Sequence, residues 1–410
     1  MNERIKIILI STIILILLIS NFNSVSGRSF EEKSKNFFGK NNDLFDELLF
    51  DLKIKTLMRK SHVPSLSVGI VKNDSLVWYK GYGYSKTLLR QKPTKDTVYQ
   101  AGSISKCVTA TAMMQLYEKG LYDLDDDVND YLDFELRNPN YPEVPITFRM
   151  LLAHQASFEE WSTKQGLYLT LTTQLSILNY PYPLIKEILL TNGSLYRAAS
   201  WNDYPPGAKC NYSNINYIVL EHLVERLTNQ SYEEYCQKNI FDPLNMNNTS
   251  FFYSDLKRSQ FANPYSHIGR FYVRQPLIDY LSGVGGMKTS VEDLSHFLIA
   301  HMNGGLYKDT RILNETTVEL MHTIQYPNCS WYGCKLGLGW IEGYEEITGD
   351  IYRGHGGEVA GGTSQMFING TGEYAYIYFL NRMFITYTQR ESDAFTTIWT
   401  MINEKGKEMC

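Results

Sequence analysis

Residues 98–120 read VYQAGSISKCVTATAMMQLYEKG, and this stretch decides both the fold and the chemistry of the chain. It begins like a strand, passes through Gly102 and continues from Val108 to Lys119 with the composition of a helix. Ser103 and Lys106, spaced i and i+3 at the start of that helix, lie on one helical face. A hydroxyl beside an ammonium group at a helix N-terminus is suited to nucleophilic catalysis, because backbone N–H groups there stabilise an oxyanion.

The Ser-x-x-Lys pattern occurs a second time, at Ser254-Asp255-Leu256-Lys257, in a polar stretch with no other chemically informative residue nearby. A serine at the start of a helix also commonly serves only as a cap. The pattern by itself therefore does not separate a nucleophile from a helix cap, and the rest of the chain must decide.

Composition places the chain among ordinary globular proteins. It has 410 residues, of which 43% are hydrophobic and 20% are charged, enough for one large domain or two interleaved subdomains. The net charge is −5 and no basic block occurs, which argues against a nucleic-acid partner.

The N-terminus resembles a signal peptide over residues 1–27. A charged start is followed by the apolar run Ile7 to Ile19 and by the small residues Ser24 to Gly27. The apolar run is shorter than the roughly 20 residues of a typical membrane span. We therefore expect a protein that is secreted or lies in an endomembrane lumen, with no stable membrane span after signal removal; a retained signal anchor is the alternative. Residues 28–42 are polar and predict a linker.

A secreted chain permits glycans and disulfides. Asn-x-Ser/Thr sequons predict a glycoprotein and occur at Asn73, Asn192, Asn211, Asn229, Asn247, Asn248, Asn314, Asn328 and Asn369. The six cysteines are Cys107, Cys210, Cys236, Cys329, Cys334 and Cys410. The chain contains no Cys-x-x-Cys pair, so a zinc site or a redox motif is not expected. A disulfide across the short Cys329–Cys334 loop is the favoured pairing, and Cys107 is expected to be a buried free thiol.

Hydrophobic periodicity changes along the chain in a way that predicts the fold class. The first part predicts a helix at 44–59 and a hairpin formed by 66–71 and 76–80. The last part predicts two strands, at 365–368 and 374–380, and a helix at 391–405. Helical patterns at 217–227, 232–240 and 291–302 lie between these ends. We predict an α+β domain over residues 43–405, followed by a tail at 406–410. Its antiparallel sheet comes from both chain ends, is flanked by helices and has a mainly helical subdomain inserted at about 110–280.

Two further motifs follow Ser103 in the chain. Tyr212-Ser213-Asn214 precedes the 217–227 helix, and a phenol near cations is a plausible general base. The alternative is a buried aromatic ring with a turn asparagine, and a similar triplet occurs at Tyr326-Pro327-Asn328.

His355-Gly356-Gly357 lies in a glycine-rich stretch before the strand predicted at 365–368, where a ligand can approach the backbone closely. The alternative is a glycine-rich turn with a surface histidine, and a counterpart occurs at His267-Ile268-Gly269. Order favours the first set, because Ser103, Tyr212 and His355 each lie near the start of a predicted element.

With these motifs in order, the chain resembles the superfamily of serine beta-lactamases and penicillin-binding proteins, in particular its class C-like branch. The supporting segments are Val63 to Val68 with Gly81-Tyr82-Gly83, Ile146 to His154, Pro206-Gly207 with Tyr212-Ser213-Asn214, Phe241 to Met246, Gly285-Gly286-Met287 and Gly337 to Trp340. The resemblance implies Ser103 as the acylated nucleophile, with Lys106 and Tyr212 sharing proton transfer. It also implies substrate-binding roles for Asn214, His355, Gly357 and Glu358.

The chain departs from the family pattern in two places. His355 stands where beta-lactamases and D,D-peptidases have the lysine of Lys-Thr-Gly, and a neutral histidine binds a carboxylate less well. Gln155-Ala156-Ser157-Phe158 replaces the usual Thr-Ser-Gly and begins an insert, rich in Tyr and Leu, that runs to about Trp201. The first departure argues against beta-lactam hydrolysis, and the second predicts an unusual wall or lid of the cleft.

The sequence thus predicts a secreted or endomembrane serine hydrolase that acts through a Ser103 acyl-enzyme on small ester or amide substrates. The alternatives are a peptidase for D-amino-acid amides or peptides, and a catalytically inactive binding protein on the same fold. No metal or organic cofactor is implied, because side chains and water suffice for the chemistry. The sequence does not determine the oligomeric state.

Overall fold

The computed structural model describes residues 43–159, 182–194, 196–268, 271–277, 279, 282–344, 349–382 and 388–409. The chain divides into two compact units, Met1–Ile54 and Lys55–Cys410, and helix α3 (Asp43–Lys60) crosses the boundary. The predicted signal peptide at 1–27 and linker at 28–42 lie outside the described residues. The fold and the site below belong to the second unit.

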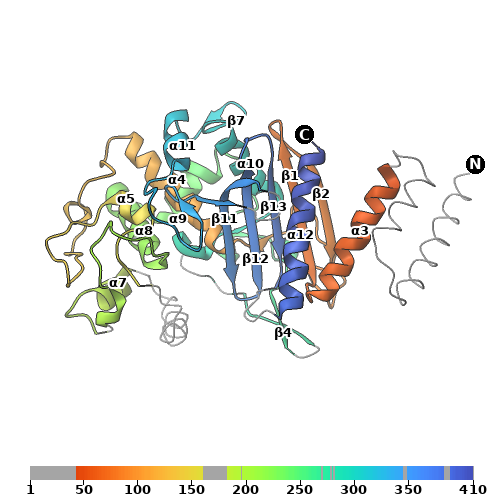
Figure 1. The fold of residues 1–410 in the computed structure, drawn as a ribbon, viewed down its shortest axis with the longest axis horizontal. Coiled ribbons are helices and arrows are strands. Elements are labelled where there is room, and N and C mark those ends of the chain that lie inside the picture. Colours follow the sequence, from red (N-terminus) through yellow and green to blue (C-terminus); the bar gives the residue numbers. More distant parts are fainter. Residues whose placement is uncertain are drawn as a thin grey trace, which may run out of the picture. The chain divides into compact units, whose positions relative to one another are not determined.

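A seven-stranded antiparallel sheet organises this unit, in the order β2-β1-β13-β12-β11-β10-β9 (Figure 1). Its strands are β1 (Ser65–Lys72), β2 (Ser75–Gly83), β9 (Lys335–Leu336), β10 (Ile341–Tyr344), β11 (Ile351–Val359), β12 (Gly362–Asn369) and β13 (Ala375–Leu380). Strand β1 pairs with β13, so the first and last parts of the domain meet within the sheet. The predicted α+β class and the sheet built from both chain ends are therefore confirmed.

The β1–β2 hairpin illustrates how local sequence sets this geometry. Lys72 pairs with Ser75, and the two residues between them, Asn73 and Asp74, have φ values of 48° and 62°. Positive φ at both central positions matches the twist of the flanking strands, and Asn and Asp tolerate this conformation better than other side chains.

Helices cover both faces of the sheet. On one face α12 (Gln389–Glu408) brings Phe395 against Tyr378 of β13, with ring centroids 5.8 Å apart. On the other face a Cβ at Gly69 would meet Val291 of α10 (Val291–Met302) at 2.6 Å, and Gly69 pairs with Ile377 of β13. Residues of β13 are buried whichever face they occupy, so this strand reads as one continuous apolar run.

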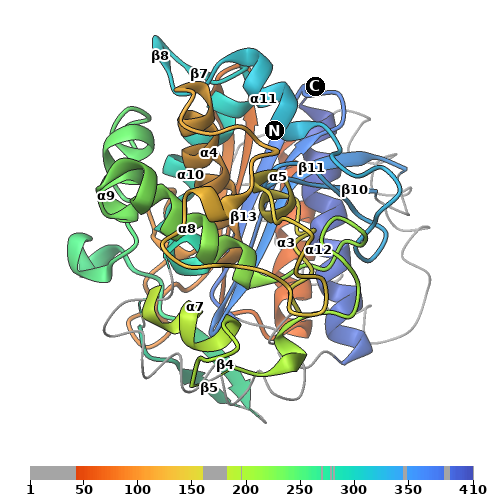
Figure 2. The same ribbon diagram turned by 90° about the vertical axis from the view of Figure 1, so that its left-hand side faces the viewer.

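The helical insert packs beside the β11 side of the sheet (Figure 1, Figure 2). Its helices are α4 (Ser105–Glu118), α5 (Phe148–Leu152), α7 (Tyr182–Leu189), α8 (Asn214–Thr228) and α9 (Tyr232–Cys236), and α11 (Glu315–His322) follows α10. Short strand pairs connect them: β3 (Tyr99–Gln100) with β6 (Lys288–Thr289), β4 (Tyr265–Ile268) with β5 (Phe271–Arg274), and β7 (Leu306–Tyr307) with β8 (Thr310–Arg311). Helix α4 is buried from Ser105 to Leu116 and packs against α8 and α9, so it is the central helix of the insert.

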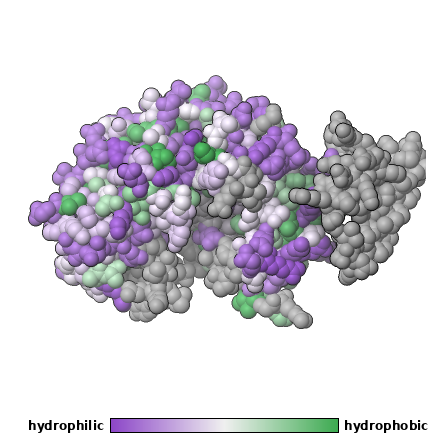
Figure 3. Space-filling view, viewed as in Figure 1, coloured by the Kyte–Doolittle hydropathy of each residue, from purple (hydrophilic) through white to green (hydrophobic). Residues whose placement is uncertain are grey.

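The surface is largely hydrophilic in the view of Figure 3. An exception is the β4–β5 hairpin at its lower edge, where Ile268, Phe271 and Val273 are exposed. Within the part of the chain that the structure describes, no helix combines the length and the apolar character needed to cross a bilayer.

The cysteine prediction is partly wrong. Cys329 and Cys334 are both free, because their side chains face different surroundings. The Cys329 sulfur lies 3.9 Å from the Ala208 carbonyl oxygen, whereas Cys334 lines a separate cavity with Ile341. Cys107 is free and fully buried, as predicted, and burial raises the pKa of its thiol.

Two other boundaries differ from expectation. Helix α12 continues to Glu408, so the residues predicted as a tail are mostly helical. His355 lies in the middle of strand β11, whereas the sequence predicted a glycine-rich segment preceding a strand. The three glycines at 354, 356 and 357 obscured the strand pattern, because glycine has low strand propensity.

Candidate active site

Ser103 and Lys106 are brought together at the start of α4. Ser103 lies in the single 3-10 turn Gly102–Ile104, and α4 begins directly after it. The Lys106 Nζ donates to Ser103 Oγ at 3.0 Å and to the Val284 carbonyl oxygen at 2.8 Å. Lys106 is fully buried while Ser103 is half-buried, so the ammonium group is held in place and the hydroxyl stays accessible.

Strand β11 runs directly against the turn that carries Ser103. Gly102 has a φ of 54°, and a Cβ there would come within 2.9 Å of the Glu358 nitrogen. A Cβ at Gly357 would lie 2.0 Å from the Ala101 carbonyl oxygen. Both glycines are thus required by close backbone approach, and the structure brings the predicted residues Gly357 and Glu358 beside Ser103.

The same part of β11 has one edge that β10 does not cover. Strand β10 pairs with β11 only as far as Gly354, whereas β12 pairs with it to Val359. Among the described residues, the stretch from His355 to Val359 therefore has one strand neighbour. Its other edge faces the turn that carries Ser103, where a Cβ at Gly102 would come within 2.9 Å of the Glu358 nitrogen.

Tyr212 approaches Lys106 from the segment just before α8, and Asn214 begins that helix. The Lys106 Nζ lies 5.2 Å from the centroid of the Tyr212 ring. That ring stacks between Trp331, at 4.7 Å, and His154, at 4.3 Å. Asn214 is the first residue of α8, whose cap is Ser213, so the cap fixes where both predicted side chains begin.

The ring of His154, which stacks on Tyr212, is held in place by hydrogen bonds. Its Nδ1 accepts hydrogen bonds from the Ser213 backbone N–H and the Asn216 side-chain amide, both at 3.2 Å. Burial, and then the charge of Lys106, hold the pKa of His154 well below its usual value. The ring is therefore neutral at pH 7, which leaves Nδ1 free to accept. The sequence marked His154 as part of a family segment but did not assign it this role.

His355 is also buried and neutral. Burial first, and then the nearby charge of Lys106, lower its pKa to about 3. Its Nδ1 lies 2.5 Å from the Gly356 carbonyl oxygen, which can only accept, so we assign the proton to Nδ1 and the lone pair to Nε2. The ring centroid lies 6.0 Å from that of Tyr212, so the structure brings the third predicted motif to the same place.

The loop that holds Lys106 was not predicted as part of the site. Val284 lies in the turn Ser282–Gly286, whose Gly283 donates its N–H to Glu221 at 2.8 Å. The Gly283 carbonyl oxygen accepts from Thr109 at 2.7 Å. Burial raises the pKa of Glu221 well above its usual value. The only sequence signal was the glycine run at 283–286, which permits the close approach of this loop.

The insert after Gln155 is described only at its two ends. Phe158 packs on Trp201, with ring centroids 4.8 Å apart, and both residues are buried. The prediction that the middle of the insert forms a lid or wall falls on residues 160–181, which lie outside the described residues.

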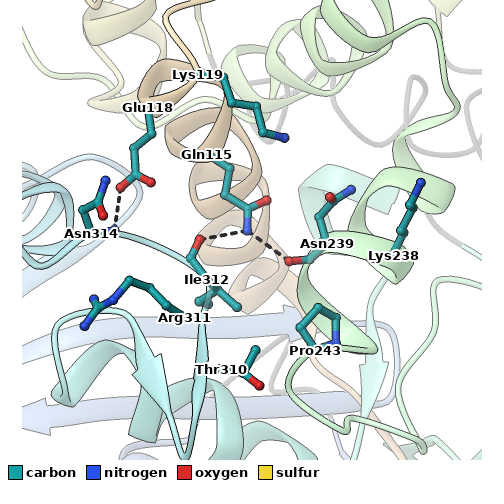
Figure 4. Close-up of a pocket in the computed structure, with 10 residues that line it drawn as sticks. All are labelled: Gln115, Glu118, Lys119, Lys238, Asn239, Pro243, Thr310, Arg311, Ile312 and Asn314. Carbon is teal, nitrogen blue, oxygen red and sulfur yellow. Dashed lines mark hydrogen bonds between the residues drawn. The ribbon is translucent and has the colours of Figure 1, made fainter.

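A separate pocket lies at the far end of α4 (Figure 4). Gln115 lines it and donates to the carbonyl oxygens of Asn239 and Ile312, both at 3.0 Å. Three cationic side chains, Lys119, Lys238 and Arg311, also line it. Residues 115–119 follow Ser103 by three or more helical turns, so this pocket is distinct from the site around the serine.

One group of side chains has the composition of a metal site. Donor atoms of His62, His267 and Glu391 lie within 4.8 Å of one another. The Glu391 carboxylate already accepts from Arg382 at 2.8 Å and from His62 at 3.2 Å. A guanidinium group on that carboxylate opposes a second cation, so the group is an ion-pair network that positions the start of α12.

Known proteins are similar to this chain over most of its length. The Beta-lactamase family matches residues 50–394. Protein flp of Staphylococcus aureus (strain MRSA252) is 27% identical over 334 residues, which cover 81% of this chain and 62% of the relative. This chain therefore spans less than two thirds of the length of that curated relative.

Solved structures share the fold. The octameric penicillin-binding protein homologue from Pyrococcus abyssi has a TM-score of 0.66 and 27% identity, over 82% of this chain and 73% of that one. A D-amino acid amidase from Ochrobactrum anthropi SV3 has a TM-score of 0.67 and 19% identity, over 87% of this chain and 99% of that one. The chain belongs to the beta-lactamase family, in the superfamily of serine beta-lactamases and penicillin-binding proteins, whose members are generally serine hydrolases.

Proposed function

We propose that the protein is a serine hydrolase that forms an acyl-enzyme at Ser103 and acts on esters or amides whose reacting end is neutral or carries a hydrogen-bond donor. The observation that carries the proposal is the 3.0 Å contact between the buried Lys106 ammonium and the half-buried Ser103 hydroxyl. A hydroxyl in contact with a positioned amine, beside the edge of strand β11, has the parts that acyl transfer requires.

The steps follow from the positions of these groups. In the reactive form Lys106 is a neutral amine, and together with Tyr212 it removes the Ser103 proton as the serine oxygen attacks the substrate carbonyl carbon. The resulting oxyanion is stabilised by the Ser103 N–H together with an N–H from the edge of β11. The same pair returns the proton to the leaving alcohol or amine, and water then hydrolyses the acyl-enzyme to a free acid.

The choice of substrate rests on His355. A lysine at this place would attract a carboxylate, whereas the neutral ring carries no charge and presents its Nε2 as an acceptor. We therefore infer that substrates with an N–H, ammonium or hydroxyl group near the scissile bond are preferred over those with a carboxylate. Beta-lactam hydrolysis is correspondingly disfavoured.

A D-amino-acid amide is the second candidate substrate. The acceptor on His355 suits an ammonium group, and the structural neighbour from Ochrobactrum anthropi is a D-amino acid amidase. At 19% identity that likeness extends to the fold, so the substrate is a hypothesis that rests on His355.

The direct test is covalent labelling with a fluorophosphonate probe. Wild type is expected to be labelled at Ser103, and Ser103→Ala is expected to remain unlabelled while keeping its melting temperature. Equal labelling of the two proteins would refute the acyl-enzyme. A folded wild type that is neither labelled nor active on short acyl nitrophenyl esters would favour the inactive binding protein.

A substrate panel then ranks the classes. It contains a nitrophenyl ester, the D- and L-phenylalanine amides and a cephalosporin-type lactam. We expect turnover of the ester or of an amide, and the weakest turnover of the lactam. His355→Lys is expected to shift the preference towards carboxylate-bearing substrates, and a lactam preference in wild type would contradict the proposed role of His355.

Secretion is part of the same proposal and rests on the signal-like residues 1–27. Expression in a eukaryotic secretory host distinguishes the alternatives. Release into the medium with glycosidase-sensitive mass supports a cleaved signal, and retention in the membrane fraction supports a signal anchor.

A further inference from the structure

Two cysteines near the active site, Cys210 and Cys329, lie in segments that pack against each other. Cys210 and Cys329 are half-buried and free, and their segments meet at the side chain of Gln155. The Cys329 sulfur is 3.8 Å from the Gln155 side-chain amide and 3.9 Å from the carbonyl oxygen of Ala208. With its amide oriented to satisfy its neighbours, Gln155 accepts from the Cys210 N–H at 3.3 Å. One side chain thus touches both cysteines.

The aromatic rings next to these cysteines confirm that the two segments run together. Tyr212 follows Cys210 by two residues, and Trp331 follows Cys329 by two residues. The two rings stack with centroids 4.7 Å apart and planes 22° apart. Burial, with a further contribution from Cys329, raises the pKa of Cys210 to about 12, as expected for neighbouring thiols. The pairs at 210 with 329 and at 212 with 331 are therefore adjacent.

The other described cysteines lack this arrangement. Cys107 and Cys236 are fully buried, and burial raises the pKa of each thiol. Cys334 lines the cavity that contains Ile341 and Trp399. Among the described residues, Cys210 and Cys329 are thus the two partly exposed thiols that share a neighbour.

We propose that Cys210 and Cys329 form a disulfide that ties the segment before α8 to the loop carrying Trp331 and so fixes Tyr212 over Lys106. The oxidant is a disulfide, either small or carried by a protein. The thiolate of one cysteine attacks it, and the second cysteine then displaces the bound half. One S–S bond of the oxidant breaks and the Cys210–Cys329 bond forms, while two electrons and two protons convert the oxidant to two thiols.

The bond itself does not depend on the proposed hydrolase activity, so its test is a mass measurement. The purified full-length chain is equilibrated with a mixture of oxidised and reduced glutathione, its remaining thiols are alkylated, and it is digested without reduction. We expect a linked pair of peptides containing Cys210 and Cys329, lighter than the two reduced peptides by about 2 Da. Alkylation of both cysteines, or a linked Cys329–Cys334 peptide, would overturn the proposal.

Serine variants distinguish loss of the disulfide from a failure of the protein to fold. Cys210→Ser and Cys329→Ser are each expected to lose the linked peptide, and Cys334→Ser to keep it. Reduction of the oxidised wild type is expected to lower its melting temperature by about 5 °C, because the bond closes a long loop. The same reductant should leave Cys210→Ser unchanged. If neither serine variant folds, the peptide map of wild type still decides.

A readout at the active site tests the consequence for Tyr212. The rate of fluorophosphonate labelling is compared in oxidised and reduced wild type, with Cys334→Ser as the control. Faster labelling of the oxidised form is expected, because the bond removes motion of the tyrosine. If the linked peptide is found but the labelling rates are equal, the disulfide exists and its proposed effect on Tyr212 is wrong. Loss of all labelling, with the linked peptide present, would instead refute the proposed hydrolase.

Discussion

The chain contains two Ser-x-x-Lys sequences, and comparing them shows what the motif requires. At Ser103 the serine and lysine lie on successive turns that lead into a buried helix, and the two side chains are 3.0 Å apart. At Ser254 the short 3-10 turn Tyr253–Asp255 ends before Lys257, and Leu256 is extended, with φ −112° and ψ 153°. Ser254 and Lys257 are both exposed, and the Ser254 hydroxyl donates to Asp255 at 3.1 Å.

The difference lies in the surroundings of the four residues. A buried lysine must have partners for its ammonium group, and Lys106 finds them in Ser103 and Val284. An exposed lysine such as Lys257 is hydrated by water and does not bind a serine firmly. The serine and lysine side chains are therefore held together only where a continuous helix and buried neighbours surround them.

Removing the two serine hydroxyls should give the largest contrast. Ser103→Ala is expected to lower ester hydrolysis by at least about 10³-fold, because no other group replaces the nucleophile. Ser254→Ala should be unchanged within error. The measurement is kcat/KM on a nitrophenyl ester with melting curves of both variants, and a substantial loss in Ser254→Ala would reverse the assignment.

The two lysines should differ nearly as much. Lys106→Met, which keeps a long buried chain without the charge, is expected to lower kcat by about 10³-fold through loss of proton transfer. Lys257→Met is expected to have wild-type activity. The probe-labelling rate is measured in both folded variants, and normal labelling of Lys106→Met would exclude Lys106 from proton transfer.

The tyrosine motif predicts a smaller effect. Tyr212→Phe retains the ring that stacks on Trp331 and His154, and removes only the phenol. We expect kcat to fall by about 10²-fold with little change in stability, and Tyr326→Phe to have no effect. The pH dependence of kcat is recorded for each, since loss of one limb in Tyr212→Phe identifies the phenol as a titrating group. An unchanged kcat would reduce Tyr212 to a packing residue.

Two glycines with positive φ test the close approach of β11. Gly102→Ala is expected to lose about 2–3 kcal/mol of unfolding free energy, from backbone strain and from the contact with Glu358. Gly120 has φ 68° and nothing within 4 Å of an added Cβ, so Gly120→Ala should lose only about 1 kcal/mol. Urea denaturation measures both. Equal losses would show that β11 does not press on the nucleophile turn.

The histidines test electrostatics through pH. The folded pKa of His355 is about 3, below the unfolded value of about 6.5, so the unfolded chain takes up the proton first on acidification. Its contribution to stability is complete above pH 6.5 and is lost towards pH 3, at about 1.4 kcal/mol per pH unit.

Replacing the two histidines isolates this contribution. His355→Asn, which stays neutral, should reduce the loss of unfolding free energy between pH 7 and pH 5 by about 2 kcal/mol. His267 is only half-buried, so His267→Asn should change this loss of unfolding free energy less than His355→Asn does. Urea unfolding at both pH values is the measurement, and identical slopes for wild type and His355→Asn would show that His355 is charged or exposed in the folded state.

Sequence reasoning recovered those parts of the fold that depend on local patterns. The β1–β2 hairpin, α10 and β13 follow from periodicity and turn residues, and their positions were predicted within a few residues. Strand β11 was missed, because its glycines carry no strand signal and are explained only by the backbone that presses on them at Ala101 and Gly102. The Cys329–Cys334 pairing failed because proximity in sequence does not fix the direction of side chains.

The sequence by itself determined the family, the order of the three motifs and the candidate site residues Ser103, Lys106, Tyr212 and His355. It did so because a helix start, a helix cap and a glycine run each depend on residues that are neighbours in the sequence. Only the tertiary structure decided which of the two Ser-x-x-Lys copies is buried and that both His154 and His355 are neutral. It alone also showed that the Val284 carbonyl oxygen completes the surroundings of Lys106. Burial and charge proximity come from segments far apart in the chain, so no local pattern contains them.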